Sequence, residues 1–157
     1  MSVAIFPGRF EPFHNGHLLV VQGMVKTGNR VIIPICRDPK IKHVFTEEEV
    51  REMISSALLA EDILDADIVV VEDMSTDAQW VDRILEAAGR PADAVVWSGN
   101  EAVRKICEEN HVATKKIVPV PGIDTHEIRK WIEAGDEKWR DKVPDDVAQI
   151  IRRRFAS

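Results

Sequence analysis

Residues 3–17, VAIFPGRFEPFHNGH, decide the fold. They open with an apolar run, Val3–Phe6, that has the length of a buried strand. A loop with two prolines follows, and the prolines favour an extended backbone up to the point where a helix begins near Gly16. The stretch therefore predicts a strand, a loop and a helix in immediate succession.

The same alternation continues along the rest of the chain. Each interval between apolar runs contains a segment of helical period. The runs themselves show little alternation of polar and apolar residues, as is typical of parallel strands covered by helices on both faces. The further runs are Val31–Ile35, Ile68–Val71, Ala94–Trp97 and Lys116–Val120. We therefore predict an α/β, Rossmann-like, doubly wound fold with a five-stranded parallel sheet of order 3-2-1-4-5.

Capping residues place the helix ends. A first helix over 16–27 stops at Gly28-Asn29, which suits a left-handed cap. Thr46 and Glu49 have the spacing of a capping box at the start of the second helix. Further helices are predicted over 78–88 and 101–109, with C-terminal helices over 125–134 and 144–155. With no linker in the sequence, we expect a single domain over residues 1–157.

Composition narrows the classes of function. The formal charge of −6 argues against broad nucleic-acid binding, which relies on Lys and Arg. No apolar run approaches the roughly 18 residues of a membrane span, and the first residues lack a secretory signal, so we expect a cytoplasmic protein. Cys36 and Cys107 are far apart and are expected to be reduced, buried thiols.

The loop after the first strand carries the chemistry. In doubly wound sheets, ligands bind beyond the carboxyl ends of the strands where the order reverses, here after strands one and four. Gly8 allows a close backbone approach to a ligand, and Arg9 offers a fork of donors to phosphate oxygens. His14 and His17 can share one face of the helix start, and Gly16 leaves its N-terminus open to phosphate. Together, the hydrogen-bond donors, the helix dipole and the positive charge of this loop predict phosphoryl transfer.

Other interpretations of this loop fit less well. No nearby Cys or third His completes a ligand set around the two histidines, so no histidine-ligated metal is predicted. The spacing of Gly8 and Gly16 does not match the dinucleotide fingerprint, and a Walker-type Lys-Ser/Thr is missing. A purely structural pair is disfavoured, because two His, one Arg and two Gly gather at one switch point. Nucleotide transfer remains.

Residues 8–17, GRFEPFHNGH, resemble the HxGH motif of the nucleotidyltransferase superfamily, and most closely the archaeal-type nicotinamide mononucleotide adenylyltransferases. Further similar segments are Phe45-Thr46, Gln79-Trp80-Val81 and Trp97-Ser98-Gly99-Asn100. The resemblance implies transfer of AMP from ATP to a phosphorylated acceptor in NAD biosynthesis. The resemblance also implies that pyrophosphate is released and that Mg²⁺ neutralises it. The implied partners are small molecules and further copies of the chain in a homo-oligomer.

The resemblance also implies residue roles. His14 and His17 would contact the triphosphate, and Trp80 would lie against the nicotinamide ring unless it is an ordinary helix-core aromatic. Gly99 and Asn100 would hold the nucleotide, or would form a plain turn and helix cap. The implied catalytic residues are Arg9, His14, His17 and Arg129, and the nucleotide-binding set is Phe6, Gly8, Arg9, His14, Gly16, His17, Gly99, Asn100, Ile123, Thr125, His126 and Arg129.

A second family motif, Ile-Ser-Ser/Gly-Thr-x-x-Arg, falls on residues 123–129, IDTHEIR, with two departures. His126 replaces a Thr and Asp124 replaces a Ser. Asp124 would repel a triphosphate unless Mg²⁺ or Arg129 compensates, or it would cap a helix with its carboxylate turned aside. Arg129 is predicted as a phosphate ligand, together with the backbone amides of Thr125 and His126.

The sequence indicates the acceptor substrate less clearly than it indicates ATP. After the second strand, Arg37, Lys40 and Lys42 could bind an acceptor phosphate or could form a mobile basic loop. Thr76-Asp77 stands where the archaeal-type enzymes have Arg-Asn, which also changes the expected pocket. The rivals are a glycerol-phosphate or choline-phosphate cytidylyltransferase, a pantetheine-phosphate adenylyltransferase, an FAD synthetase and a non-catalytic nucleotide-binding regulator.

Overall fold

The fold is seen in a computed structural model, which describes residues 2–73 and 76–155. These residues form two units, each described by itself. Unit 1 comprises Met1–Arg9, Val20–Lys42 and Asp65–Val118, and unit 2 comprises Phe10–Leu19, His43–Leu64 and Pro119–Ser157. The single domain expected over 1–157 remains a prediction, and residues 1, 74, 75, 156 and 157 lie outside the described residues.

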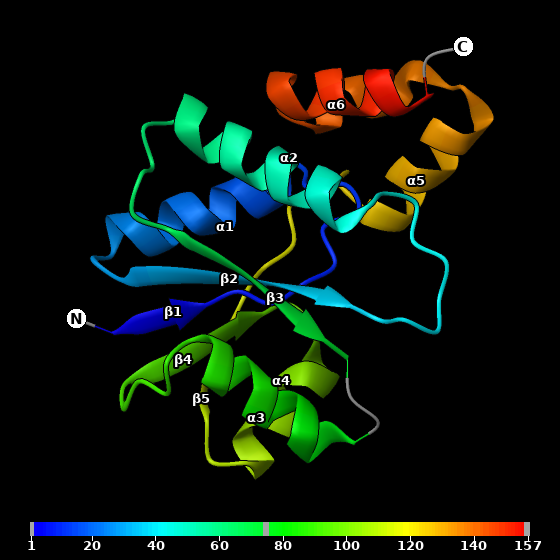
Figure 1. The fold of residues 1–157 in the computed structure, drawn as a ribbon. Coiled ribbons are helices and arrows are strands. Elements are labelled where there is room, and N and C mark those ends of the chain that lie inside the picture. Colours follow the sequence, from blue (N-terminus) through cyan, green and yellow to red (C-terminus); the bar gives the residue numbers. More distant parts are fainter. Residues whose placement is uncertain (1, 74–75, 156–157) are drawn as a thin grey trace. The chain divides into compact units, whose positions relative to one another are not determined.

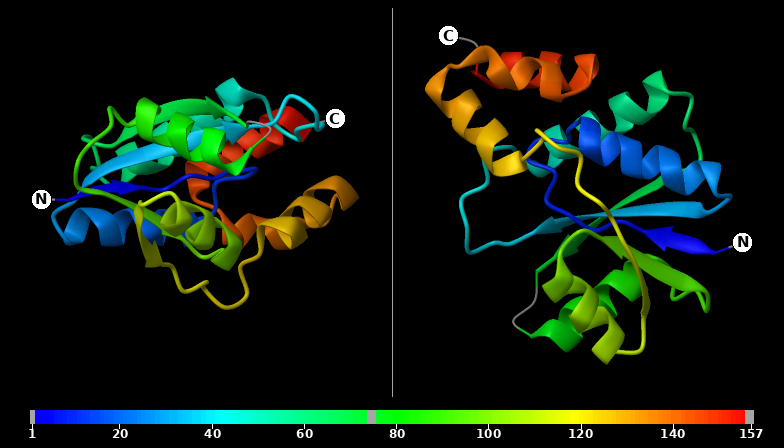
Figure 2. Two further views of the ribbon diagram at one scale, coloured as in Figure 1. Left: turned by 90° about the horizontal axis from the view of Figure 1, so that it is seen from below. Right: turned by 180° about the vertical axis from the view of Figure 1, so that it is seen from behind.

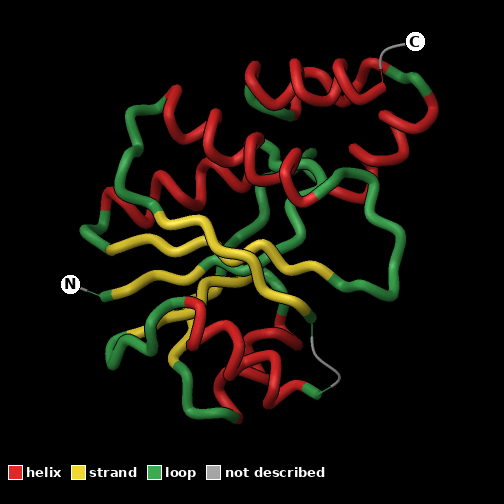
Figure 3. Tube along the Cα trace, viewed as in Figure 1, coloured by secondary structure: helices red, strands yellow, loops and turns green. Residues whose placement is uncertain are grey.

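Unit 1 contains the parallel sheet (Figure 1, Figure 3). Its order is β3-β2-β1-β4-β5, and all four strand pairs are parallel. The strands are β1 (Val3–Ile5), β2 (Arg30–Arg37), β3 (Asp67–Glu72), β4 (Ala94–Ser98) and β5 (Ala113–Lys116). The predicted fold class and strand order are therefore confirmed.

The predicted bounds of the fifth strand are wrong. The apolar run at 116–120 predicts a strand there, whereas β5 ends at Lys116 and Val118 is 78% exposed. The pairing with β4 sets this limit, because Ser98 opposite Lys116 is the last pair before the chain leaves β4 for a helix. β5 is an edge strand with mostly exposed side chains, so apolar periodicity does not mark it.

Helices pack on the sheet within unit 1. Helices α3 (Asp77–Ala87) and α4 (Glu101–Glu109) lie on one face, and the last turns of α1 (Asn15–Lys26) lie on the other (Figure 1, Figure 2). The core of the α3 and α4 side includes Ile5, Val96 and Cys107. Both cysteines are buried and free, as predicted.

Unit 2 is helical. It contains α2 (Glu47–Ala60), α5 (Thr125–Ala134), the 3₁₀ helix η1 (Glu137–Lys142) and α6 (Asp145–Phe155). The predicted capping box is present: Thr46 Oγ1 accepts from the Glu49 amide at 3.1 Å, and Glu49 Oε1 accepts from the Thr46 amide at 2.8 Å. None of the helices among the described residues is long and apolar enough to cross a membrane.

The basic cluster near the C-terminus is engaged in ion pairs within unit 2. Its three arginines contact glutamates of η1 and α2. The pairs are Arg152–Glu137 at 2.7 Å, Arg153–Glu52 at 2.6 Å and Arg154–Glu49 at 3.8 Å. These charges therefore tie α6 to α2 and η1.

Candidate active site

The segment after β1 first continues the sheet of unit 1. The amides of Phe6 and Gly8 donate to the carbonyls of Ile32 and Pro34, at 2.9 and 3.2 Å, and the Cys36 amide donates to the Gly8 carbonyl at 2.8 Å. Gly8 also bridges to Ile35 in the parallel sense. Gly8 is therefore part of an extended strand-like segment alongside β2, not a turn.

A pocket of about 410 Å³ in unit 1 lies at the carboxyl ends of the strands. It brings together four predicted residues, Gly8, Arg9, Trp80 and Asn100. The rest of its lining is Pro7, Cys36, Asp73, Ser98 and Val103. The rule that ligands bind beyond the carboxyl ends of parallel strands pointed to this edge of the sheet.

The charged groups of this pocket are Arg9 and Asp73. Arg9 Nη2 lies 3.5 Å from Asp73 Oδ2, and the Asp73 amide donates to the Arg37 carbonyl at 2.8 Å. Burial, with a smaller contribution from Asp73, raises the pKa of the Cys36 thiol to about 12. The thiol is thus protonated at neutral pH and is not a nucleophile.

Trp80 is a core aromatic that also borders the pocket, and its contact with a nicotinamide ring stays a prediction. It is half-buried, packs against the hydrophobic core of unit 1 and also lines the pocket. Asn100 is a helix cap, because its Oδ1 accepts from the amides of Ala102 at 2.9 Å and Val103 at 3.3 Å. A Cβ at Gly99 would lie 3.3 Å from the Ile117 carbonyl oxygen, so close backbone packing favours glycine there.

In unit 2, the two motif histidines form a stacked pair at the start of α1. Their ring centroids are 3.5 Å apart with an interplanar angle of 14°. His14 Nδ1 accepts from the amides of Gly16 at 3.1 Å and His17 at 3.3 Å. The hydrogen of neutral His14 is therefore on Nε2, which donates to Thr125 Oγ1 at 2.9 Å. His17 Nδ1 accepts from the His14 amide at 3.1 Å, which leaves its Nε2 as the donor.

The histidines are neutral donors in this structure. Burial lowers the pKa of His14 to about 4, although the charge of Asp124 acts in the opposite direction. Burial, reinforced by the neighbouring His14, lowers the pKa of His17 well below 6.5. At neutral pH these side chains therefore offer directed N–H groups, and the formal positive charge of the site comes from arginine.

Gly16 also has a different role from the expected one. A Cβ at this position would lie 2.9 Å from His14 Cε1, so a side chain would displace the imidazole. The amides of Gly16 and His17 are directed at His14 Nδ1. In this structure, glycine makes room for His14, and the helix N-terminus is closed by that histidine.

The second motif forms the start of α5 beside this pair. Asp124 is the N-cap, and its Oδ1 accepts from the His126 amide at 2.9 Å. The capping alternative for Asp124 is thus confirmed, and the His126 amide is engaged in it. Arg129 Nη1 donates to the Glu11 carbonyl at 3.1 Å. Unit 2 therefore gathers His14, Thr125 and Arg129, with Ile123 next to Gly16.

Arg37 and Lys40 are not in the lining of the unit 1 pocket. Arg37 ends β2, and exposed Lys40 lies in a turn where its amide donates to Asp38 Oδ1 at 2.9 Å. Their assignment to the acceptor phosphate stays a prediction.

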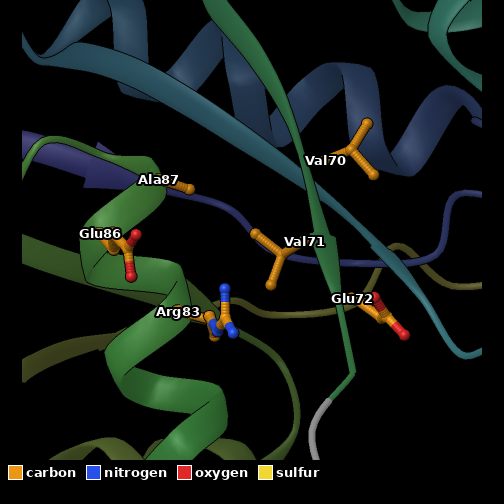
Figure 4. A pocket seen from close by; sticks show the side chains of 6 residues that line it. All are labelled: Val70, Val71, Glu72, Arg83, Glu86 and Ala87. Atoms are coloured by element: carbon orange, nitrogen blue, oxygen red, sulfur yellow. The ribbon is translucent and has the colours of Figure 1, made fainter.

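A second pocket of unit 1, of about 270 Å³, lies between β3 and α3 (Figure 4). Its lining is Val70, Val71, Glu72, Arg83, Glu86 and Ala87, none of which belongs to the predicted site. Within residues 2–73 and 76–155, no group of three or more His, Cys, Asp or Glu is arranged to hold a metal ion.

Three residues of the site were missed from sequence. Asp73 directly follows β3, at the carboxyl edge of the sheet, but the prediction considered only the segments after strands one and four. Glu11 is inside the motif loop, residues 6–14 between β1 and α1, but nothing in its spacing indicates that its side chain is buried. Its partner His43 is 32 positions away, and no local pattern connects the two.

Comparison with known proteins shows which family the chain belongs to. Residues 5–132 match the sequence profile described as cytidylyltransferase-like. The chain belongs to this family. A nicotinamide-nucleotide adenylyltransferase of Thermoplasma volcanium is 31% identical over 95% of this chain and 85% of its own. Nicotinamide-nucleotide adenylyltransferase 1 of Sulfolobus acidocaldarius is 35% identical over 95% of this chain and 88% of its own.

Solved structures support the fold. A crystal structure of a bifunctional NMN adenylyltransferase/ADP ribose pyrophosphatase from Francisella tularensis, complexed with AMP and a manganese ion, superposes with a TM-score of 0.83 at 20% identity. The match covers 99% of this chain and 49% of that one, so this chain spans about half the length of the bifunctional protein. At this identity the likeness concerns the fold alone.

Proposed function

We propose that the chain transfers AMP from ATP to nicotinamide mononucleotide and releases pyrophosphate. The observation that carries the proposal is the polar cluster in unit 2: the neutral donors His14 and His17 at the start of α1, with Thr125 and Arg129 on α5. Family membership and the archaeal relatives support the same reaction.

The donors are suited to a reaction in which negative charge is redistributed over phosphate. An acceptor phosphate oxygen attacks the α-phosphorus in line, the bond from that phosphorus to the pyrophosphate oxygen breaks, and the electron pair leaves with pyrophosphate. A phosphate monoester is already an adequate nucleophile, so neither a general base nor a covalent enzyme intermediate is required. Preorganised N–H groups and a guanidinium lower the barrier because they need little reorganisation during the reaction.

The Thr125 hydroxyl shows where His14 directs its hydrogen. This hydroxyl accepts the His14 Nε2 hydrogen at 2.9 Å, the kind of contact that a phosphate oxygen makes. We expect a triphosphate oxygen to take over that hydrogen. Arg129 then supplies the formal positive charge that the neutral imidazoles lack.

The unit 1 pocket is proposed to hold the nicotinamide ring. Trp80 provides an aromatic wall, and a pyridinium cation is attracted to an aromatic face. Asp73 in the same lining adds a negative charge that favours a cationic ring. Mg²⁺ is expected to arrive on the triphosphate, since it retains waters and prefers phosphate oxygens, which fits a chain without a cluster of acidic ligands among its described residues.

A substrate panel tests the reaction and its rivals. Pyrophosphate release is measured with ATP or CTP and with nicotinamide mononucleotide, nicotinic acid mononucleotide, phosphopantetheine, riboflavin phosphate, glycerol 3-phosphate or phosphocholine. ATP with nicotinamide mononucleotide should give the highest kcat/KM. A preference for CTP would establish a cytidylyltransferase, and ATP binding without release from any pair would establish a regulator.

The oligomer is proposed from the family resemblance, the location from the first residues of the sequence, and the small-molecule substrates from the family resemblance and the net negative charge. We infer a cytoplasmic homo-oligomer that acts on small molecules and not on nucleic acid. Light scattering of the purified chain measures its mass in solution. A mass equal to the 17.7 kDa of one chain would contradict the oligomer.

A further inference from the structure

The loop that leads to His14 and the start of α1 contains a buried carboxylate that the reaction does not use. Glu11 and His14 are the buried polar or charged residues of the described chain, 4% and 7% exposed. Burial of a carboxylate is costly unless its oxygens are hydrogen-bonded. A carboxylate buried three positions before a candidate catalytic histidine is therefore expected to have hydrogen-bond partners and a role in the structure of the site.

Both oxygens of Glu11 have partners in the segment just before α2. Oε1 accepts from the Phe45 amide at 3.1 Å, and Oε2 lies 2.7 Å from His43 Nδ1. A carboxylate is an acceptor only, so Nδ1 carries the hydrogen in this contact. The side chains of His43 and Glu11 are 10% and 5% exposed, so water competes little for the bond.

The backbone of Glu11 reaches the other half of the site. Its carbonyl accepts from Arg129 Nη1 at 3.1 Å, so the position of this carbonyl helps set the position of the guanidinium. The preceding residue, Phe10, has a φ of 53°, a conformation that residues other than glycine rarely adopt. The Phe10 ring meets the His17 ring edge-on at 4.9 Å between centroids.

We propose that Glu11 and His43 are positioning residues, which hold the motif loop so that Arg129, His14 and His17 keep the geometry the transfer requires. The Glu11 side chain fixes the loop to the α2 segment, its carbonyl directs Arg129, and the adjacent Phe10 supports His17. Neither residue touches the reacting atoms. The role rests on the proposed function, since it acts through that function's donors.

Three substitutions at one position separate this role from general stability. His43→Ala removes the donor to Glu11, whereas His43→Asn places an amide nitrogen where Nδ1 was and keeps it. His43→Leu fills space without a donor. We expect kcat to fall by about tenfold or more in the Ala and Leu variants, because small misplacements of catalytic groups are costly, and to be largely restored in Asn. KM for ATP should change less than kcat.

A destabilised variant outside the loop is the matched control. Ile151→Ala empties a buried position of α6 in the same unit, and Ile151 is 1% exposed. At a temperature well below both melting points, it should keep a wild-type kcat. If His43→Ala and Ile151→Ala lower Tm equally and have equal kcat, or if Asn restores no more activity than Leu, the positioning role is wrong.

A spectroscopic readout is independent of turnover. The chain has five histidines, so the imidazole nitrogen resonances of His14 and His17 can be assigned in the ¹⁵N-labelled protein. His43→Ala should shift them, and His43→Asn should return them towards wild type. Unmoved resonances in a folded His43→Ala protein would overturn the proposal. A wild-type protein inactive on every substrate pair would refute the proposed function, and the resonances would still decide the positioning role.

Discussion

Glycine at position 16 and histidine at position 14 depend on each other. A Cβ on Gly16 would contact the imidazole at 2.9 Å, and the same imidazole accepts the Gly16 and His17 amides through Nδ1. This contact fixes the tautomer and therefore directs the Nε2 hydrogen outward, now to Thr125. Because burial keeps both rings neutral, their contribution at neutral pH is the direction of a donor, with no cost of turning it during the reaction.

His17→Ala tests the donors at the residue scale. The variant loses one transition-state donor, and kcat should fall by about 10²-fold or more. Initial rates of pyrophosphate release at saturating ATP and nicotinamide mononucleotide provide the measurement. Leu19→Ala is the control, because this residue lies on the same helix and is 53% exposed. Near-normal turnover of His17→Ala would remove the central role of the histidine pair.

At the scale of elements, helix α5 places Thr125 and Arg129 of the second motif against the loop that precedes α1. Thr125 is its first residue and Arg129 follows one turn later, so the hydroxyl and the guanidinium share a side of the helix. Asp124 begins the helix by capping the His126 amide. The departure from a serine is therefore compatible with the local fold, but it places a carboxylate near His14, whose pKa responds to that charge.

Asp124→Asn separates the capping role from the charge. Asparagine caps about as well as aspartate, so the free energy of unfolding should stay nearly unchanged, whereas Asp124→Ala should lower it by about 1 kcal/mol. Removal of the negative charge should lower KM for ATP, because a carboxylate repels a triphosphate. Thermal unfolding and steady-state kinetics measure the two effects. A raised KM in Asp124→Asn would instead indicate that the carboxylate assists the Mg²⁺ of ATP.

At the scale of the whole molecule, the sequence predicts what depends on local order. Alternating apolar runs and helix caps predict the parallel sheet and the capping box at Thr46, and the right-handed crossover rule limits the order of the strands. The bounds of β5 could not be predicted, because its partner β4 determines where pairing ends. The neutral state of the histidines depends on burial, and the Glu11–His43 contact joins residues 32 positions apart. Such properties arise only after tertiary packing.

Burial of His14 should make the stability of the protein depend on pH. Its pKa is about 4 in the folded protein and 6.5 as the ordinary value, so between these values the unfolded chain binds a proton that the folded protein does not. The free energy of unfolding should therefore fall as pH decreases from 6.5 towards 4, by up to about 3 kcal/mol from this group. His17 acts in the same direction, because burial also lowers its pKa.

Urea unfolding at a series of pH values, with His14→Gln beside the wild type, measures this contribution. The variant lacks the imidazole, so its stability should decrease less over the same pH interval. His111→Asn is the control, because this histidine is exposed and asparagine tolerates its positive φ of 64°. It should keep the wild-type slope. An equal slope in His14→Gln and the wild type would show that the pKa of His14 is the same in the folded and the unfolded protein, and the lowered pKa would then be wrong.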